Sequence, residues 1–329
     1  ELKLGVVSPL AKDEEKFRLV VLLEPLYKVC TATMSSRVLS SLHRYGLLDA
    51  AQFGFVTDGS CHDPLKIMAR LYERGRGAGG EELHVAFLDA TSAFDSVPHA
   101  VLDAALRRLG APPDFIAWIR AVLSGHRRKA VTAYETDADD EAIELEGGAP
   151  QGCPSSPLVW TILADYALAV MRAERGDDAV DVRFGGGVLR CLAFADDLAV
   201  VAKTHEGLRK RVQTLVAAMG AIGVRFNSKK SYYAWSAAAA RRRQLDPAEA
   251  PANLLEIDVL DADGRWRRAA LTSVPPVGDA EGETLAERGA ARYLGVFFAF
   301  EGVEGEAWAE QDACTQRIVG NFFSKIALI

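Results

Sequence analysis

The sequence is short of the residues that would indicate a zinc module or a disulfide-rich protein. Its five cysteines are scattered through 329 residues, with no Cys-x-x-Cys pair and no histidine at ligand spacing. The sequence therefore argues against a structural zinc site and a disulfide framework, and predicts a reducing, intracellular compartment. Because no secretory signal is recognisable, we expect the nucleus, the cytoplasm or both.

A long hydrophobic run is also missing. The longest apolar stretch, 158–171, contains Asp165 and is too short to span a bilayer comfortably, so it predicts a core helix and no membrane partner. With 49% hydrophobic residues, the chain is typical of a globular protein of two or three subdomains. It starts at Glu1 and stops within an apolar segment at Ile329, which predicts a piece of a longer protein.

An excess of positive charge, the usual mark of a nucleic-acid-binding protein, is absent. The chain has 38 Lys and Arg against 45 Asp and Glu, a net charge of −7. The charge is uneven, however, because acidic residues collect in 137–146 and after Gly278. The basic residues cluster at 127–129, 209–211, 229–230 and 241–243. The net charge therefore weakens a nucleic-acid function without excluding it.

Two apolar stretches that end on carboxylates are the most informative features of the sequence. Asp196 and Asp197 lie between two apolar runs of strand length, which predicts the tip of a tight hairpin. Alone, such a pair is typical of a solvated acidic turn. A second apolar run, 85–88, also ends on a carboxylate, Asp89. Together the three predict a site for two Mg²⁺ ions that clamp the attacking and leaving oxygens of a phosphoryl transfer, as in a polymerase.

The most unusual loop is 147–157, which contains three glycines and three prolines around Gln151. Such a backbone is suited to holding one amide side chain against a substrate. A simple entry into the next helix explains the prolines but not Gln151. Near the start of the chain, Lys12 and Arg18 are either contacts to a triphosphate or template, or solvated loop charges.

Periodicity predicts the remaining elements. We expect helices over 34–48, 97–109, 114–123, 158–171 and 208–222. We expect strands over 127–134 paired with 142–145, over 180–194, around a turn at 261–264, and over 293–298. The Ala- and Arg-rich segment 236–253 reads as a linker or insertion.

These stretches, in this order, resemble a reverse transcriptase of the non-LTR retrotransposon or group II intron lineage. The resemblance runs from about Gly5 to Gly295 and is carried by five motifs. They are Phe87-Leu-Asp89 with Ala93-Phe94-Asp95, Ala149-Pro-Gln-Gly-Cys-Pro, Phe194-Ala-Asp-Asp197, the segment 223–230, and Tyr293-Leu-Gly295.

The resemblance implies a fold and a domain order. It implies an α+β right-hand polymerase whose palm is an antiparallel sheet backed by helices. Fingers would occupy 1–80 with part of 120–147, and the palm 81–119 and 148–300, with a variable insertion at 236–290. Residues 301–329 would start a truncated thumb.

The resemblance also implies roles for single residues. Asp89, Asp196 and Asp197 would bind two Mg²⁺ ions, for which Mn²⁺ is a possible substitute. Lys230, rather than Lys229, would be the general acid. The other implied contacts are finger residues Lys12 and Arg18, the triphosphate-binding backbone at Ala90 and Ala93, the steric gate Phe94, Gln151 with Gly152 at template and incoming base, and the primer grip Tyr293, Leu294 and Gly295.

The implied reaction is RNA-templated extension of a DNA primer with dNTPs. Related enzymes carry Gly and then a basic residue where this chain has Asp58 and Gly59, which predicts weaker nucleotide binding or an inactive copy. The alternatives are a catalytically inactive scaffold that binds RNA or protein, and an RNA-dependent RNA polymerase, which the bulky Phe94 disfavours. The parent element and the oligomeric state are left open.

Overall fold

The fold is known from a computed structural model of the whole chain. It describes residues 3–11, 17–56, 59–76, 79–91, 98–130, 143–144, 148, 152–243, 255–261, 263–274, 290–294 and 296–299. The chain divides into two compact units. The first comprises Glu1–Gly59, Thr91–Val170 and Ala217–Arg225, and the second Ser60–Ala90, Met171–Val216 and Phe226–Ile329.

The first unit combines a small sheet with helices. Its strands are β1 (Leu4–Ala11), β2 (Phe17–Leu22), β4 (Arg127–Ala130) and β5 (Ile143–Glu144), in the order β2-β1-β4-β5. Its helices are α1 (Pro25–Arg44), α3 (His99–Arg108), α4 (Pro113–Leu123) and most of α5 (Ser156–Arg172). The pairing of β4 with β5 agrees with the hairpin predicted there.

Helix α1 corrects one expectation, because it begins at Pro25 and not at Met34. Its buried positions include Thr31 and Ser35, whose small hydroxyl side chains hide the inward face from a search for apolar periodicity. The helix ends at Arg44 rather than continuing to Leu48 because Gly46 adopts a φ of 61°, which terminates the last turn.

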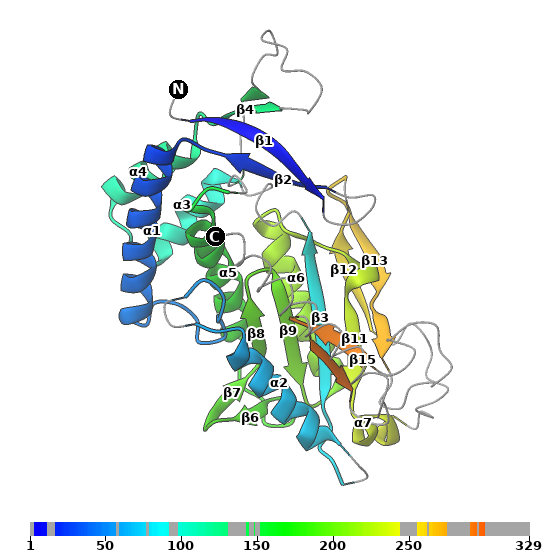
Figure 1. Cartoon of the computed structure of the whole chain (residues 1–329). Coiled ribbons are helices and arrows are strands. Elements are labelled where there is room, and N and C mark those ends of the chain that lie inside the picture. The colour runs from blue at the N-terminus through cyan, green and yellow to red at the C-terminus, as the bar shows by residue number, and fades with distance from the viewer. Residues whose placement is uncertain are drawn as a thin grey trace, which may run out of the picture. The chain divides into compact units, whose positions relative to one another are not determined.

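The second unit is built on a sheet with the strand order β14-β11-β3-β9-β8, and β10 also pairs with β3 (Figure 1). The strands are β3 (His84–Thr91), β8 (Cys191–Phe194), β9 (Asp197–Ala202), β10 (Arg225–Phe226), β11 (Tyr232–Trp235) and β14 (Thr272–Val274). The β8–β9, β9–β3 and β3–β11 pairs are antiparallel, and β11–β14 is parallel. The sheet is therefore mostly antiparallel, as predicted.

The central strands β3 and β9 are buried along nearly their whole length, which explains their continuous apolar sequences. Helix α2 (His62–Gly75) contacts β8, and α6 (His205–Ala221) buries the apolar side chains Leu208, Val212 and Leu215. Three further hairpins lie among the described residues of this unit. They are β6 (Val182–Phe184) with β7 (Gly187–Leu189), β12 (Glu256–Leu260) with β13 (Trp266–Ala270), and β15 (Ala290–Tyr293) with β16 (Val296–Ala299).

The segment after Ser236 corrects a second expectation. Residues Ala237–Arg242 form helix α7, in which three alanines are buried, so this part is no linker. The Ser236 hydroxyl accepts the N–H of Ala239 at 3.3 Å and the N–H of Leu83 at 3.0 Å, and so ties the helix to the start of β3. Residues 244–254 lie outside the described part of the chain.

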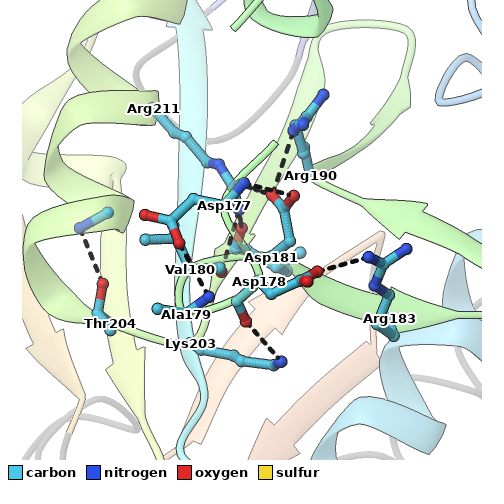
Figure 2. Close-up of polar contacts among 12 residues, drawn as sticks. Asp177, Asp178, Ala179, Val180, Asp181, Arg183, Arg190, Lys203, Thr204 and Arg211 are labelled. Atoms are coloured by element: carbon cyan, nitrogen blue, oxygen red, sulfur yellow. Dashed lines mark hydrogen bonds and ion pairs between the residues drawn. The ribbon is translucent and has the colours of Figure 1, made fainter. Parts of the chain in front are cut away.

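A buried ion-pair cluster anchors the β8–β9 hairpin at the end opposite its turn (Figure 2). The Asp181 carboxylate pairs with Arg211 of α6 and lies 3.4 Å from the Arg190 Nε, just before β8. Arg211 also donates to the Val201 carbonyl of β9 at 2.9 Å. The Asp181 carboxylate therefore links α6 to the base of β8, and Arg211 links the same helix to the base of β9.

Within the described residues, no helix is long and apolar enough to cross a membrane.

Candidate active site

The tip of the β8–β9 hairpin carries the predicted pair of aspartates. Phe194 and Asp197 are register partners, so Ala195 and Asp196 form a two-residue loop. The positive φ that such a loop requires falls on Ala195, at 55°, and not on an aspartate. For an alanine this conformation costs about 1 kcal/mol. The loop leaves Asp196 exposed beyond the ends of the strands.

The neighbouring strand brings the third carboxylate to the same edge of the sheet. Asp89 near the end of β3 and Asp197 at the start of β9 are register partners. Directly paired residues on neighbouring antiparallel strands have Cβ atoms about 5 Å apart. The structure thus brings together Asp89, Asp196 and Asp197 from two distant stretches.

The electrostatics at this edge reflect that proximity. The pKa of Asp197 is raised to about 6, first because protein atoms displace water around its carboxyl group, and then because of the negative charges of Asp196 and Asp89. The positive charge of Arg292 in β15 acts in the opposite direction. The three carboxylates are therefore an unfavourable concentration of like charge, which bound cations would relieve.

A closed set of hydrogen bonds fixes the end of β3 beside the segment with Lys230. The Asp89 N–H donates to the Ser231 hydroxyl at 3.1 Å, and that hydroxyl donates to the Asn227 carbonyl at 2.8 Å. The Asn227 N–H in turn donates to the Asp89 carbonyl at 2.9 Å. Lys230 ends the short 3₁₀ helix Ser228–Lys230 inside this set, with its side chain exposed. The predicted general acid thus lies on a segment bonded to a predicted metal ligand.

The predicted primer grip packs against the same strands. Tyr293 of β15 donates its hydroxyl hydrogen to the Leu192 carbonyl of β8 at 3.4 Å, and its ring lies 5.5 Å from that of Phe87 in β3. Burial raises the pKa of Tyr293, so it remains a neutral donor. Leu294 follows with a φ of 49° and turns the chain toward β16.

Other predicted residues are placed only in part. Ala90 is buried in β3, and Gly152, in the first unit, has a φ of 106°. Arg18 lies in β2, although its side chain is outside the described part. The remaining predictions fall outside the described residues, and they are Lys12, Ala93, Phe94, Gln151 and Gly295.

Gly59, at the departure from the family pattern, occupies a confined position. A Cβ on this residue would lie 2.4 Å from the Phe53 carbonyl oxygen and 2.6 Å from a Val56 methyl group. A side chain of any size therefore requires the loop to move, so replacing Gly59 with an arginine changes more than charge. Asp58 itself lies outside the described residues.

The donor set of the three aspartates fits a hard divalent cation, because Mg²⁺ prefers carboxylate oxygens. Their mutual repulsion supports this fit. Among the described residues, however, no group of three or more His, Cys, Asp or Glu side chains is placed so that it could hold a metal ion. Metal binding at this edge is therefore a proposal.

The chain belongs to the family described as "Reverse transcriptase (RNA-dependent DNA polymerase)", which it matches over residues 10–296. Members of this family generally use divalent metal ions. The match confirms the predicted family.

Sequence relatives support the non-LTR retrotransposon lineage. The Pol polyprotein of the type-2 retrotransposable element R2DM of Drosophila melanogaster is 27% identical over 223 residues, 68% of this chain and 20% of the relative. The R2 Pol polyprotein of Nasonia vitripennis is 30% identical over 60% of this chain and 18% of its own length. The chain thus spans about a fifth of these relatives.

Solved structures agree on the fold. The telomerase of Candida albicans, solved with a fragment of telomeric RNA, matches 81% of this chain and 45% of its own with a TM-score of 0.54 at 10% identity. Apo telomerase of Candida tropicalis, truncated from its C-terminal domain, gives the same score over 72% of this chain and 51% of its own. The chain therefore has the mixed helix-and-sheet fold of reverse transcriptases.

Two residues of the site were missed by the sequence analysis. Ser231 bonds to the backbone of Asp89, and Arg292 is the cation whose charge opposes the raised pKa of Asp197. The available signals were positional, because Ser231 directly follows Lys229-Lys230 and Arg292 directly precedes Tyr293. The role of both residues becomes visible only from contacts between segments that are distant in the sequence.

Proposed function

We propose that this chain is the polymerase portion of a retroelement protein and extends a DNA primer with dNTPs on an RNA template. The observation that carries the proposal is the meeting of Asp89, Asp196 and Asp197 at one edge of the sheet, within a chain of the reverse transcriptase family. We further propose that the second unit contains most of a palm, that the first contains fingers, and that residues 301–329 begin a thumb.

The carboxylates are proposed to hold two Mg²⁺ ions, with Mn²⁺ as a substitute. Such ions, when bound, would supply the positive charge that stabilises the attacking and leaving oxygens. Asp89 and Asp196 would each contribute ligand oxygens to both ions, and Asp197 would support them. The fixed register of β3 against β9 supports this role, because it sets the carboxylate positions before substrate binds.

Other residues are proposed to bind and orient the substrates. Lys230 would give a proton to the pyrophosphate leaving group, since its segment is hydrogen-bonded to the end of β3. The backbone at Ala90 and Ala93 would receive the triphosphate, and Phe94 would exclude a 2′-hydroxyl. Gln151 and Gly152 would position the template and the incoming base.

Three further contacts complete the proposal. Lys12 and Arg18 would contact the triphosphate or template from the fingers. Tyr293, Leu294 and Gly295 would hold the primer terminus, and the packing of Tyr293 on β8 supports a rigid link between that grip and the aspartates. Action inside the cell, in nucleus or cytoplasm, remains a prediction.

Templated extension tests this function. A labelled DNA primer on a heteropolymeric RNA template is incubated with the chain, four dNTPs and Mg²⁺, and then with each dNTP left out in turn. We expect full extension with four dNTPs and arrest one position before the complement of the missing nucleotide. A Phe94→Ala variant should gain extension with rNTPs. A soluble chain that binds primer–template yet extends nothing with Mg²⁺ or Mn²⁺ would support the scaffold alternative instead.

A further inference from the structure

The β12–β13 hairpin of the second unit (Figure 1) carries an exposed tryptophan that the proposed reaction does not use. Trp235 lies in the core, whereas Trp266 of β13 is 50% exposed. Trp266 stands between Arg265 and Arg267, Arg268 follows, and all four side chains are exposed. An aromatic ring in water among arginines is typical of surfaces that bind unpaired nucleic acid, because bases stack on the ring and cations attract the phosphates.

A hydrogen-bonded turn fixes the end of the hairpin that carries this ring. The Asp261 carboxylate accepts the N–H of Arg265 at 2.8 Å, and the Asp261 N–H donates to the Arg265 carbonyl at 2.9 Å. Gly264 supplies the positive φ of 74° that the turn requires. The turn therefore presents Arg265 and Trp266 in a defined place before any ligand binds.

The base of the hairpin is attached to the core of the unit. The side-chain amide of Gln213 in α6 donates to the Asp258 carbonyl at 3.2 Å and accepts the Asp258 N–H at 2.8 Å, as a neighbouring strand would. Ile257 and Val259 of β12 are buried on one face of the hairpin. Because strand residues alternate between faces, Trp266 lies on the opposite face, which is left to solvent.

Hydrogen bonds also connect the hairpin to the edge of the sheet with the aspartates. Just after β13, the Thr272 N–H donates to the Ser231 carbonyl at 3.0 Å, and the Ser231 hydroxyl accepts the N–H of Asp89 at 3.1 Å. Strand β13 also contacts the 3₁₀ helix Ser228–Lys230, on which Lys229 is exposed. The exposed face of the hairpin therefore belongs to an element that is bonded to the candidate active site.

The charges indicate which ligand this face fits. Arg267 pairs with Asp261 at 2.5 Å, and Arg268 pairs with an acidic residue of β12 at 3.3 Å. Among the described residues, no acidic side chain forms an ion pair with Arg265 or Lys229. An apolar protein surface would offer these two cations no partner. A polyanion with flat bases satisfies both the cations and the ring.

We propose that the exposed face of the β12–β13 hairpin binds an unpaired stretch of RNA. One base stacks on Trp266, and Arg265 and Lys229 contact the neighbouring phosphates. The inference rests on the proposed polymerase function, because the template ahead of the primer is the unpaired RNA that such an enzyme holds. The strand must be unpaired, since the bases of a duplex stack on one another and offer the ring no free face.

Equilibrium binding tests the stacking contact without requiring activity. A short labelled adenine-rich RNA is titrated with the full chain, and fluorescence anisotropy gives the Kd. Trp266→Ala should weaken binding about tenfold, as expected for the loss of one stacked base. Trp266→Phe keeps a ring and should stay within about threefold of the wild type, whereas Trp266→Leu keeps only apolar bulk and should behave like the alanine variant. Tyr45→Ala, at an exposed ring of the first unit, is the matched control and should bind normally.

Two further comparisons separate stacking from general charge attraction. RNA duplex of the same sequence should bind wild type and Trp266→Ala equally. Arg265→Gln should reduce the slope of log Kd against log salt concentration by about 0.7, the value for one phosphate contact on a single strand. Arg183→Gln is the control, because its guanidinium already pairs with Asp178 at 2.5 Å, and it should leave the slope unchanged.

Three results would overturn the proposal. They are no binding of unpaired RNA by the wild type, an unchanged Kd in Trp266→Ala, or an equal loss for unpaired and duplex RNA. A chain that binds unpaired RNA through Trp266 and yet extends no primer would refute the polymerase function and leave the hairpin site standing. A chain that extends primers while Trp266→Ala binds RNA as tightly as the wild type would refute the hairpin site alone.

Discussion

Asp89 and Asp197 stand opposite each other across strands β3 and β9, although a large part of the chain separates them in sequence. The pairing makes the candidate site a property of the sheet register, because a shift by one residue would turn Asp89 to the other face. It also places like charges side by side, and after the loss of water around the carboxyl group these charges are the next cause of the raised pKa of Asp197. The arrangement that the proposed metal site requires therefore lowers the stability of the fold at this edge.

The first prediction concerns that opposition. Asp89→Asn removes one negative charge from the cluster and should abolish primer extension while raising stability by about 0.5–1 kcal/mol. Urea denaturation and primer extension measure the two effects. The matched control is Asp258→Asn in β12, whose carboxylate is 3.5 Å from Arg268 and should not be stabilised by neutralisation. A less stable or fully active Asp89→Asn chain would contradict the prediction.

The second prediction concerns the buried ion-pair cluster at the base of the β8–β9 hairpin (Figure 2). Asp181→Ala leaves Arg211 buried without its partner and should cost about 3–5 kcal/mol. Asp178→Ala is the matched control, because it pairs with Arg183 at 2.5 Å on the surface and should cost less than about 1 kcal/mol. Chemical denaturation compares them. Equal losses of unfolding free energy in the two variants would show that burial does not determine how much an ion pair contributes to stability.

The same carboxylate predicts acid sensitivity. Burial alone would raise the pKa of Asp181, but Arg211, the N–H of Asp177 and Arg190 outweigh it and hold the pKa below its usual value. A depressed carboxyl pKa contributes stability above the unfolded pKa of about 4, and that stability is lost as the pH falls through the folded pKa. The free energy of unfolding should therefore fall below about pH 4 in the wild type, and less steeply in an Asp181→Asn chain.

The third prediction uses the buried His84 at the other end of β3. Burial lowers the pKa of His84, despite the opposing effect of Glu82 at 3.4 Å, and the Nδ1 lies 2.7 Å from the Tyr233 hydroxyl. The rings of His205 and Tyr233 pack around it, and the charge of Arg243 also lowers the pKa.

Because the folded pKa is depressed, the unfolded chain binds the proton first, and stability should fall as the pH drops below about 6.5. The slope should reach about 1.4 kcal/mol per pH unit for this residue. His84→Gln should remove that slope, and His62→Gln, at an exposed position, should keep it. Urea titrations between pH 5 and pH 7.5 give the comparison. An unchanged slope in His84→Gln would show that another group titrates.

The fourth prediction separates two reasons why position 152 requires glycine, which are its positive φ and the lack of space for a Cβ. Both Gly152 and Gly110 have positive φ, at 106° and 77°, but only Gly152 lacks room for a Cβ. Gly110→Ala should cost about 1 kcal/mol from backbone strain alone. Gly152→Ala should cost clearly more, because the Val21 carbonyl must move, and should also impair nucleotide incorporation. Equal effects of the two substitutions in denaturation and incorporation assays would contradict a close approach of the loop to β2.

The sequence was most informative about the aspartates of the candidate site and about the buried strands that carry them. Asp89, Asp196 and Asp197 were predicted because two separate apolar runs of strand length both end on carboxylates, and β3, β8 and β9 were predicted from these apolar runs. Helix α1 was misplaced because Thr31 and Ser35 occupy buried positions. Helix α7 was not predicted, because its alanines and arginines have the low-complexity composition of a linker or insertion.

The rest of the site depends on contacts that no local pattern encodes. Ser231 matters because its hydroxyl closes a ring of hydrogen bonds with Asp89 and Asn227. Tyr27 of α1 is a similar case, because its hydroxyl contacts both the Val122 carbonyl of α4 and the Cys153 thiol. In the sequence, Gly59 marks only the absence of a positive charge. The structure adds that Phe53 and Val56 leave no room for a side chain at this position.

The most direct test is single-nucleotide incorporation into a primer on an RNA template, comparing the wild type with Asp196→Asn and Asp263→Asn. Both residues are exposed aspartates at hairpin turns of the second unit, but only Asp196 adjoins the β3–β9 edge. We predict that Asp196→Asn loses about a thousandfold in rate, as expected when charge stabilisation of several kcal/mol is removed. Asp263→Asn should retain the wild-type rate. Equal rates for the wild type and Asp196→Asn would contradict the assignment of the site.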